Sequence, residues 1–414
     1  MSKVEMMSAK DKKKGASVPR LRFPEFQNAG EWKEKQLGAC LGYQQPTAYL
    51  VSNTNYNSSF VTPVLTAGKA FILGYTNERH GIFNEGLPVI IFDDFTTATQ
   101  FVDFPFKAKS SAMKILEAKK GANIKFMYEV LQTISYCTET HERHWISKFA
   151  PMPIKIPQLR EQQKVADCLS SLDQRINAET EKLDALKAHK NGLLKQLFPL
   201  EGETLPALRF PEFRDAGEWK KADFGNIAKF LSGGTPSKDV CDYWGGDIPW
   251  ISASSMHNTK IEKSDCNITK LAVSNGARIA PKGTLLLLVR GSMLHKRILL
   301  GISEIDVSFN QDVKALVLND DITELYLMYF LMASESKLLA TVVQTGIGAG
   351  KLDTDDLNNF PIMMPSPIEQ QRISNCLSSL DELIAAQTQK INLLKDHKKG
   401  LMQQLFPRID EVRA

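Results

Sequence analysis

Basic side chains in polar loops are the residues of this sequence best suited to chemistry, and that chemistry is the binding of a polyanion. Residues 285–289 read as an apolar strand, and the loop Arg290-Gly-Ser-Met-Leu-His-Lys-Arg297 follows it before another apolar run. Arg can hold a guanine edge through two parallel hydrogen bonds, and Lys can neutralise a phosphate. Arg290, Lys296 and Arg297 are therefore candidate nucleic-acid contacts. The alternative is that they are solvated loop charges.

Acidic and short polar side chains follow another apolar strand, at residues 88–92. Asp93 and Asp94 could serve a metal or a nuclease, but no Lys or His constellation accompanies them, which disfavours that interpretation. Thr96 and Thr97 are candidates either to contact base edges or to cap a turn. We predict no metal site here.

Further candidates flank the strands of the same region. Lys69, Arg79 and His80 lie beside apolar runs and are predicted to contact a nucleic-acid backbone. The run His141-Glu-Arg-His-Trp145 lacks the H-E-x-x-H spacing of a zinc protease, so Arg143 is interpreted as a surface or DNA-contacting residue.

No set of residues predicts catalysis by this chain. The glycine-rich run 345–352 imitates a phosphate loop, but Lys351 is followed by Leu352 where Mg²⁺ would need Ser or Thr. The six cysteines include no C-x-x-C pair, and we interpret them as reduced thiols. No nucleophile, base and metal set converges, so we predict no catalytic residue and no cofactor in this chain.

Two tryptophans lie among glycines in the second half of the chain. Trp244 and Trp250 could stack on a base or a sugar, but packing in the core is the more frequent role of such residues.

The composition is that of a globular protein with several cores. The chain has 414 residues, 43% hydrophobic and 24% charged, with a net charge of +4. At roughly 150 residues per domain, this length predicts two or three domains. No apolar run approaches the ~18 residues that cross a bilayer, and no apolar segment follows the basic N-terminus as in a secretory signal. We therefore expect no membrane contact and a cytoplasmic location.

The elements that position these residues are duplicated. Residues 19–32 (PRLRFPEFQNAGEW) recur as 206–219 (PALRFPEFRDAGEW), and residues 153–199 recur as 361–407 with 26 of 47 aligned positions identical. The stretches between these repeats show no evident alignment with each other. The order is a variable region, a repeat, a second variable region and a second repeat, which indicates an intragenic duplication with exchanged contents.

Each long repeat has heptad spacing and predicts a helix of about 38 residues. The predicted pairing positions are Leu169, Leu172, Ile176, Glu179, Leu183 and Leu186 in the first helix, and Leu377, Leu380, Ile384, Ile391, Leu394 and Lys398 in the second. The helices could each pack on a neighbouring domain, but their shared seam favours pairing with each other. If they run antiparallel about an axis midway between the polar interruptions, Glu179 would face Lys398 and Lys190 would face Gln387.

This arrangement resembles the specificity (S) subunit of type I restriction-modification systems, in which each of two target-recognition regions is followed by a repeated helical region. The matching residues are Pro157, Glu161, Gln162 and Gln163 in the first copy and Pro365, Glu369, Gln370, Gln371, Arg372 and Ile373 in the second. The runs 232–238 and 345–352 look like the opening and the ending of a family recognition region. Residues 45–51 and 63–69 resemble a different class of such regions. Lys238 and Lys351, within the first two runs, are further candidate DNA contacts.

The resemblance implies an α+β fold with two α/β target-recognition domains, separated and linked by two long antiparallel helices that form a coiled coil in a pseudo-two-fold duplication. The predicted segments are a basic flexible tail at 1–18, recognition domain 1 at 19–152, a spacer helix region at 153–205, recognition domain 2 at 206–360 and a second spacer helix region at 361–414.

The resemblance also implies a non-catalytic subunit that reads double-stranded DNA with an asymmetric bipartite target. Two methyltransferase subunits would dock on the helices and methylate adenine with S-adenosylmethionine. Endonuclease and translocase subunits, which use ATP and Mg²⁺, would join them. The alternative is an assembly scaffold with two ligand-binding domains and no nucleic acid.

The charge distribution limits any contact with DNA. Residues 19–152 sum to +2 (14 basic, 12 acidic) and residues 206–360 to −2 (17 basic, 19 acidic). If these regions bind DNA, their basic side chains must gather on one face, or partner subunits must supply much of the phosphate contact. We expect weak DNA binding by the isolated chain.

Overall fold

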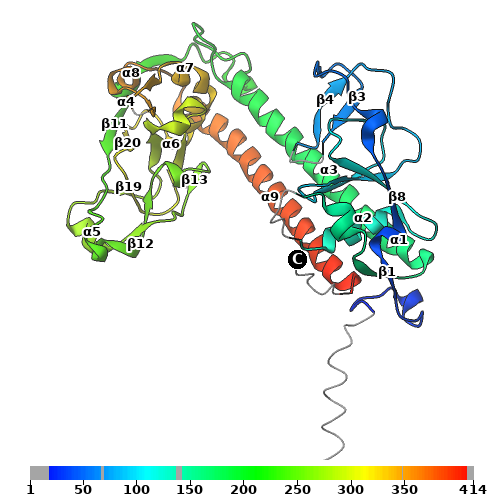
Figure 1. Ribbon diagram of the computed structural model, residues 1–414. Coiled ribbons are helices and arrows are strands. Elements are labelled where there is room, and N and C mark those ends of the chain that lie inside the picture. Colours follow the sequence, from blue (N-terminus) through cyan, green and yellow to red (C-terminus); the bar gives the residue numbers. More distant parts are fainter. Residues whose placement is uncertain (1–17, 67–69, 137–141, 347, 408–414) are drawn as a thin grey trace, which may run out of the picture. The chain divides into compact units, whose positions relative to one another are not determined.

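The computed structural model describes residues 18–66, 70–136, 142–346 and 348–407. Lys69, His141 and all but the last residue of the predicted basic tail lie outside the described residues. The chain divides into two compact units (Figure 1). Unit 1 comprises residues 1–180 and 389–414, and unit 2 comprises residues 181–388. Each unit therefore contains one variable region and half of each long helix.

Unit 1 is built on a four-stranded sheet in the order β2-β8-β5-β6, with a three-stranded sheet β4-β3-β7 and the pair β1-β9. Its strands are β1 (Lys33–Gln36), β2 (Leu41–Gln44), β3 (Thr62–Leu65), β4 (Ile72–Thr76), β5 (Val89–Asp93), β6 (Thr99–Val102), β7 (Lys107–Ala108), β8 (Met113–Ala118) and β9 (Pro153–Ile156). Its helices are α1 (Leu37–Cys40), α2 (Ile124–Thr133) and the first half of α3 (Leu159–Leu197).

The central strand β5 explains how unit 1 forms two cores. Successive strand side chains point to opposite faces of a sheet. Ile90 and Phe92 accordingly join the cluster that contains Phe126 of α2, whereas Val89 and Ile91 join a second cluster with Leu65 of β3. Because both faces are covered, the strand reads as a continuous apolar run.

Unit 2 is built on a five-stranded sheet in the order β11-β20-β16-β18-β13, with sheets β14-β12-β19-β15 and β17-β22-β21 and the pair β10-β23. Its strands are β10 (Lys220–Asp223), β11 (Ala228–Ser232), β12 (Trp244–Ile251), β13 (Lys260–Ile261), β14 (Asn267–Ile268), β15 (Ile279–Ala280), β16 (Leu285–Leu288), β17 (Arg290–Gly291), β18 (Leu300–Ser303), β19 (Val307–Phe309), β20 (Val313–Leu318), β21 (Val343–Gln344), β22 (Gly350–Lys351) and β23 (Pro361–Met364). Its helices are α4 (Phe224–Ile227), α5 (Lys270–Ser274), α6 (Glu324–Ala333), α7 (Glu335–Ala340), α8 (Thr354–Asn358) and the first half of α9 (Pro367–Leu405).

The two variable regions share a central frame that their sequences do not reveal. In unit 1, β8 pairs with β2 on one side and β5 on the other, and α2 follows it. In unit 2, β20 pairs with β11 and β16 in the same way, and α6 follows it. The duplication therefore extends into the variable regions, where the central strands are retained and the surrounding segments differ.

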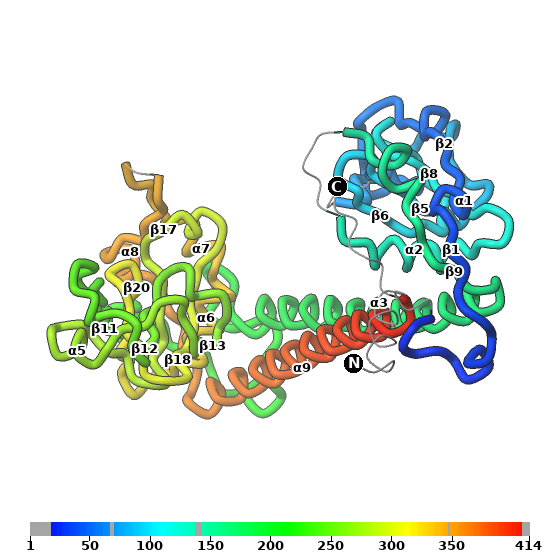
Figure 2. Tube along the Cα trace, turned by 60° about the horizontal axis from the view of Figure 1, so that its bottom comes forward, coloured from blue at the N-terminus to red at the C-terminus, as the bar shows by residue number. Residues whose placement is uncertain are grey.

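The long helices α3 and α9 each have 39 residues and pack antiparallel (Figure 2). In unit 1, the first half of α3 lies against the last half of α9, so that Leu169 and Leu405 join one core cluster. In unit 2, Leu197 and Leu377 do the same. The predicted pairing positions are buried or half-buried: Leu169, Ile176, Glu179, Leu183, Leu377 and Ile391 in the first class, and Leu172, Leu186, Leu380, Ile384, Leu394 and Lys398 in the second.

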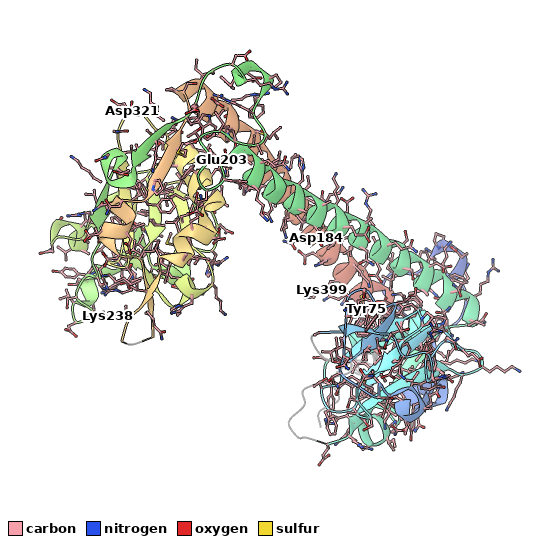
Figure 3. All side chains as sticks on the ribbon, turned by 90° about the horizontal axis from the view of Figure 1, so that it is seen from above. Tyr75, Asp184, Glu203, Lys238, Asp321 and Lys399 are labelled. Atoms are coloured by element: carbon pink, nitrogen blue, oxygen red, sulfur yellow. The ribbon has the colours of Figure 1, made fainter. Side chains whose placement is uncertain are left out.

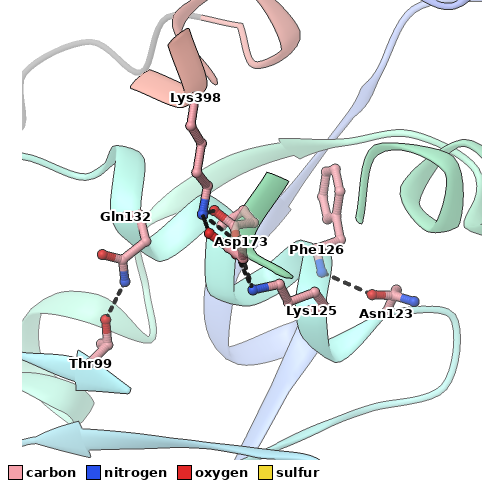
Figure 4. Close-up of polar contacts among 8 residues, drawn as sticks. Thr99, Asn123, Lys125, Phe126, Gln132, Asp173 and Lys398 are labelled. Atoms are coloured by element: carbon pink, nitrogen blue, oxygen red, sulfur yellow. Dashed lines mark hydrogen bonds and ion pairs between the residues drawn. The ribbon is translucent and has the colours of Figure 1, made fainter. Parts of the chain in front are cut away.

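The predicted register between these helices is wrong by about one heptad. Lys398 pairs with Asp173 (2.6 Å) and not with Glu179, which instead pairs with Lys390 (2.7 Å). Lys190 pairs with Asp381 (2.5 Å) rather than facing Gln387. The lysines on the seam reach carboxylates that flank it, as Figure 4 shows for Lys398 and Asp173. Lys398 also approaches Glu129 of α2 (3.3 Å). The ion pairs of Lys398 and Lys190 occupy equivalent positions in the two repeats.

A double-mutant cycle checks this register. The substitutions Lys398→Met and Asp173→Asn are expected to show a coupling energy of about 1 kcal/mol, because both side chains are mostly buried and form a close ion pair. Lys398→Met with Glu179→Gln should show none. Amide hydrogen exchange in unit 1, which contains all three residues, is the measurement. Coupling between Lys398 and Glu179, with none between Lys398 and Asp173, would support the register predicted from the heptad seam instead.

An equivalent buried glutamate in each unit explains why the segment at 19–32 recurs at 206–219. In unit 1, both oxygens of Glu161 accept hydrogen bonds from Arg22 (2.7 Å each), and Glu161 also accepts from Trp32 Nε1 (3.1 Å). In unit 2, Glu369 accepts in the same way from Arg209 (2.8 Å each) and from Trp219 Nε1 (3.3 Å). These residues are the Arg and Trp of each RFPEF…GEW segment and the Glu of each E-Q-Q element.

The neighbouring glutamine joins each long helix to the shared frame. The Gln162 side chain accepts from Asn123 N (2.9 Å) and donates to the carbonyl of Pro157 (2.9 Å). The Gln370 side chain accepts from Thr323 N (3.2 Å) and donates to the carbonyl of Pro365 (3.2 Å). Asn123 and Thr323 are the N-cap residues of α2 and α6, so each repeat is fastened to the helix that covers its sheet.

Candidate nucleic-acid interface

The basic loop predicted in unit 2 is divided by the fold. Arg290 begins β17, which pairs with β22 so that Arg290 lies opposite Lys351. The 3₁₀ helix η8 (Ser292–His295) follows, and Lys296 and Arg297 come after it. All three basic side chains of the loop are exposed. Arg297 lines a hollow of ≈ 300 Å³ together with Asn191 of α3, whereas Arg290 does not line it.

Arg290 belongs to a cationic cluster that includes two residues the sequence did not suggest, Arg278 and Lys314. The pKa of Lys314 is lowered, first by burial and then by the positive charges of Arg278 and Arg290. The Arg278 guanidinium donates to the carbonyl of Ser232 (2.9 Å), and Lys314 Nζ donates to the hydroxyl of the same serine. We name Arg278, Arg290 and Lys314 the cationic cluster.

The loop after β11 borders this cluster and is held by the two tryptophans. Trp250 Nε1 donates to the carbonyl of Gly234 (3.0 Å), and Trp244 Nε1 donates to that of Ser237 (3.1 Å). Their rings meet edge to face at 5.4 Å, and both are half-buried. The indoles are therefore structural supports of the 232–238 loop. Lys238 is exposed on it, at the end of unit 2 opposite Asp321 (Figure 3).

Lys351 differs from the residues of the cationic cluster because its charge is compensated. Its Nζ forms an ion pair with Asp353 (2.9 Å), and both side chains are about 40% exposed. The hydrogen bond from Lys351 is the main cause of the lowered pKa of Asp353.

In unit 1, the predicted candidates are dispersed. Arg79 and His80 are exposed in the loop after β4, and Arg79 lines a hollow of ≈ 400 Å³ beside Val61, which is 87% exposed. Arg143 is exposed just before the π-helix η4 (Trp145–Phe149). Thr96 is exposed in the turn after β5.

The acidic pair after β5 has structural roles. Asp93 Oδ1 accepts from the backbone N–H groups of Phe95 (2.9 Å) and Thr96 (2.8 Å), which fixes the turn. Asp94 forms a buried ion pair with Lys114 (3.2 Å) and accepts from Trp145 N (2.8 Å). Thr97 has a left-handed backbone (φ 58°), as the turn requires. Over the described ranges, no group of three or more metal-ligating side chains is assembled, and none of the described helices is long and apolar enough to span a membrane.

Known proteins with similar sequences belong to one family. The profile of the type I restriction modification DNA specificity domain matches residues 3–188 and 216–396. The specificity subunit of the type I restriction enzyme EcoR124I/EcoR124II of Escherichia coli is 36% identical over 362 residues, which cover 84% of this chain and 86% of that one. The MjaIX specificity subunit of Methanocaldococcus jannaschii is 30% identical over 47% of this chain and 48% of its own length.

Solved structures agree on the fold. The S subunit of the type I restriction-modification system of M. genitalium superposes with a TM-score of 0.62 at 15% identity, over 95% of this chain and all of that one. A chain from a structure of the assembly and conformational transition of the type I R-M system gives a TM-score of 0.54 at 17% identity, covering 91% of this chain and 97% of that one. These likenesses show that the duplicated α+β frame with two long helices is a fold shared with those structures. The chain belongs to the specificity-subunit family of type I restriction-modification systems.

Proposed function

We propose that this specificity subunit is non-catalytic and reads an asymmetric bipartite DNA target, one half with each unit. The observation that carries this proposal is a repeated frame around exchanged contents. The contacts of Glu161 recur at Glu369, and those of Gln162 recur at Gln370, while the segments around the central strands differ. A frame of this kind places two unlike reading surfaces on equivalent supports, as in a protein dimer whose two half-sites have been made different.

The partners follow from this division of labour. Two methyltransferase subunits would dock on the helices and modify adenine with S-adenosylmethionine, and endonuclease subunits would use ATP and Mg²⁺. The paired helices α3 and α9 would set the spacing of the two half-sites. Because its target would be chromosomal or invading DNA, we expect the subunit to act in the cytoplasm.

The test is adenine-methylation mapping in cells that express this chain with its methyltransferase subunit. A split motif is expected that is absent when the methyltransferase is expressed alone. Replacing residues 206–360 with the corresponding region of a related subunit should change one half of the motif and leave the other half and the spacing intact, because both long helices, α3 and α9, lie outside the exchanged segment.

A swap of residues 19–152 is the matched control and should change the opposite half. If neither swap alters the motif, the units do not read the target. A stable complex that produces no motif would favour the alternative of an assembly scaffold.

A further inference from the structure

Lys114 in unit 1 and Lys314 in unit 2 occupy the same place in the shared frame. Each is the second residue of the strand that lies between its two neighbours, β8 in unit 1 and β20 in unit 2. Lys114 lies opposite Phe92 of β5, and Lys314 lies opposite Leu287 of β16. The same strand position therefore carries a lysine in both units, in surroundings that can be compared directly.

In unit 1, a buried aspartate compensates the positive charge of this lysine. Lys114 is 1% exposed and pairs with Asp94, which follows Phe92 by two residues and is itself buried. The ring of Tyr43 lies 5.2 Å from Lys114 Nζ and adds a cation–π contact. A buried charge needs such compensation, because transfer out of water is costly.

Unit 2 has no acid at the position equivalent to Asp94, and Lys314 has two further cations as neighbours. Val289 follows Leu287 by two residues and stands where Asp94 stands in unit 1. Arg290 directly follows Val289, whose N–H donates to the Asp312 carbonyl (2.8 Å) beside the start of β20. Burial lowers the pKa of Lys314 most, and the positive charges of Arg278 and Arg290 lower it further. Across the described part of the chain, no carboxylate forms an ion pair with any member of the cationic cluster. Asp312, two residues before Lys314, is bonded instead by the Asn310 side chain (3.3 Å).

The hydrogen bonds of the cluster go to one neutral residue. Ser232 accepts from both Arg278 and Lys314, which orients the two cations and leaves their charges uncompensated. The loop after Ser232 packs closely against Phe309 of β19, which fixes the position of Ser232. A Cβ at Gly233 would lie 2.0 Å from the Phe309 carbonyl oxygen, so only glycine fits there. Gly234 N also donates to that carbonyl (2.9 Å). A rigid loop thus holds like charges together.

We propose that the cationic cluster of Arg278, Arg290 and Lys314 binds the phosphate backbone of the DNA that unit 2 reads. This inference rests on the proposed function and deepens it. An oxyanion would supply the negative charge that Asp94 supplies in unit 1. Arg presents a planar fork of donors to phosphate oxygens, and Lys acts as a point charge. Backbone contacts position a protein on the duplex without reading its sequence.

The assignment also explains how a region with a net charge of −2 meets DNA. Its acidic residues outnumber its basic ones, so an even distribution of charge would repel a polyanion. Three cations gathered at one place, with no carboxylate paired to them among the described residues, provide a local site for a polyanion despite that balance.

The experiment measures duplex binding by the complex of this chain with its methyltransferase subunits, as a function of KCl concentration. Two duplexes are used, one with the mapped target and one without it. Lys314→Gln, Arg278→Gln and Arg290→Gln are each expected to weaken binding to both duplexes by a similar factor, about tenfold. Each should reduce the slope of log Kd against log salt by about one, which is the signature of a lost phosphate contact.

The matched control is Lys263→Gln, which removes one charge from a side chain in unit 2 that is 86% exposed. It should leave the affinity and the salt slope unchanged. Val289→Asp is a second, independent variant that gives Lys314 the carboxylate Lys114 has. Val289→Asp should weaken binding as Lys314→Gln does. The variant Lys314→Arg keeps the positive charge and should therefore show the same salt slope as the wild-type complex.

The outcomes separate this inference from the proposed function. If the cluster variants behave like Lys263→Gln, the cationic cluster does not bind DNA, although the chain reads its target. Weaker binding to the target duplex alone, with an unchanged salt slope, would mean base contacts and would overturn the phosphate assignment. A wild-type complex that binds neither duplex would overturn the proposed function, and this inference with it.

Discussion

Replacing Glu369 with Gln is expected to lower the free energy of unfolding of unit 2 by about 3–5 kcal/mol. Glu369 is 1% exposed and receives two hydrogen bonds from Arg209 and one from Trp219. The substitution removes the counter-charge of Arg209, whose side chain is 9% exposed. A buried guanidinium without a partner is more costly than the pair was favourable. Amide hydrogen exchange is the measurement, because a chain with two units does not unfold in one transition.

Two further variants test whether the effect is local. Glu161→Gln removes the equivalent partner of Arg22 and should raise exchange in unit 1 in the same way. Glu212→Gln should change the free energy of unfolding by no more than about 1 kcal/mol, because its ion pair with Arg372 is about half exposed on both sides. Equal effects of Glu212→Gln and Glu369→Gln would show that burial of Glu369 is not what matters.

The sequence predicts the frame of this molecule well because the frame is repetitive. Heptad spacing predicts both long helices, and the internal repeat predicts their equivalence. The register between α3 and α9 cannot be predicted from heptad spacing in the same way. It depends on Asp173 beside the seam and on Glu129 of α2, a buried carboxylate that also pairs with Lys125 (2.9 Å). Seam positions alone do not reveal such partners, so the sequence-based register missed them.

The candidate interface shows the same limit at the level of single residues. The sequence predicts Arg290 as a contact from its place after an apolar strand, but it does not predict Arg278 or Lys314. A signal for Lys314 did exist, because a lysine inside the apolar strand VKALVL requires a partner or a function. Its neighbours come from other strands and turns, however, and only the fold shows that they are cations. Asp94 shows the opposite case. The sequence offers a metal or nuclease role for it and disfavours that role for want of a nearby Lys or His, whereas the fold brings Lys114 to it from another strand.

Lys114→Met is expected to lower the free energy of unfolding of unit 1 by about 3–5 kcal/mol, since it leaves the buried carboxylate of Asp94 without its cation. The double variant Lys114→Met with Asp94→Asn should recover most of this loss. Asn is neutral and its side-chain oxygen can still accept from Trp145 N, the bond that Asp94 makes now (2.8 Å). Hydrogen exchange in unit 1 is again the measurement.

Lys314→Met at the equivalent position should leave unit 2 as stable as before, or more stable. The pKa of Lys314 is lowered in the folded protein, so its protonated form costs stability at neutral pH, and removing the lysine relieves both burial and repulsion by Arg278 and Arg290. The lost hydrogen bond to Ser232, worth about 0.5–1.5 kcal/mol, opposes this gain. A loss as large as that of Lys114→Met would make Lys314 a structural residue. Stability that depends on Lys114 together with DNA binding that depends on Lys314 would instead show that one strand position serves the fold in one unit and the ligand in the other.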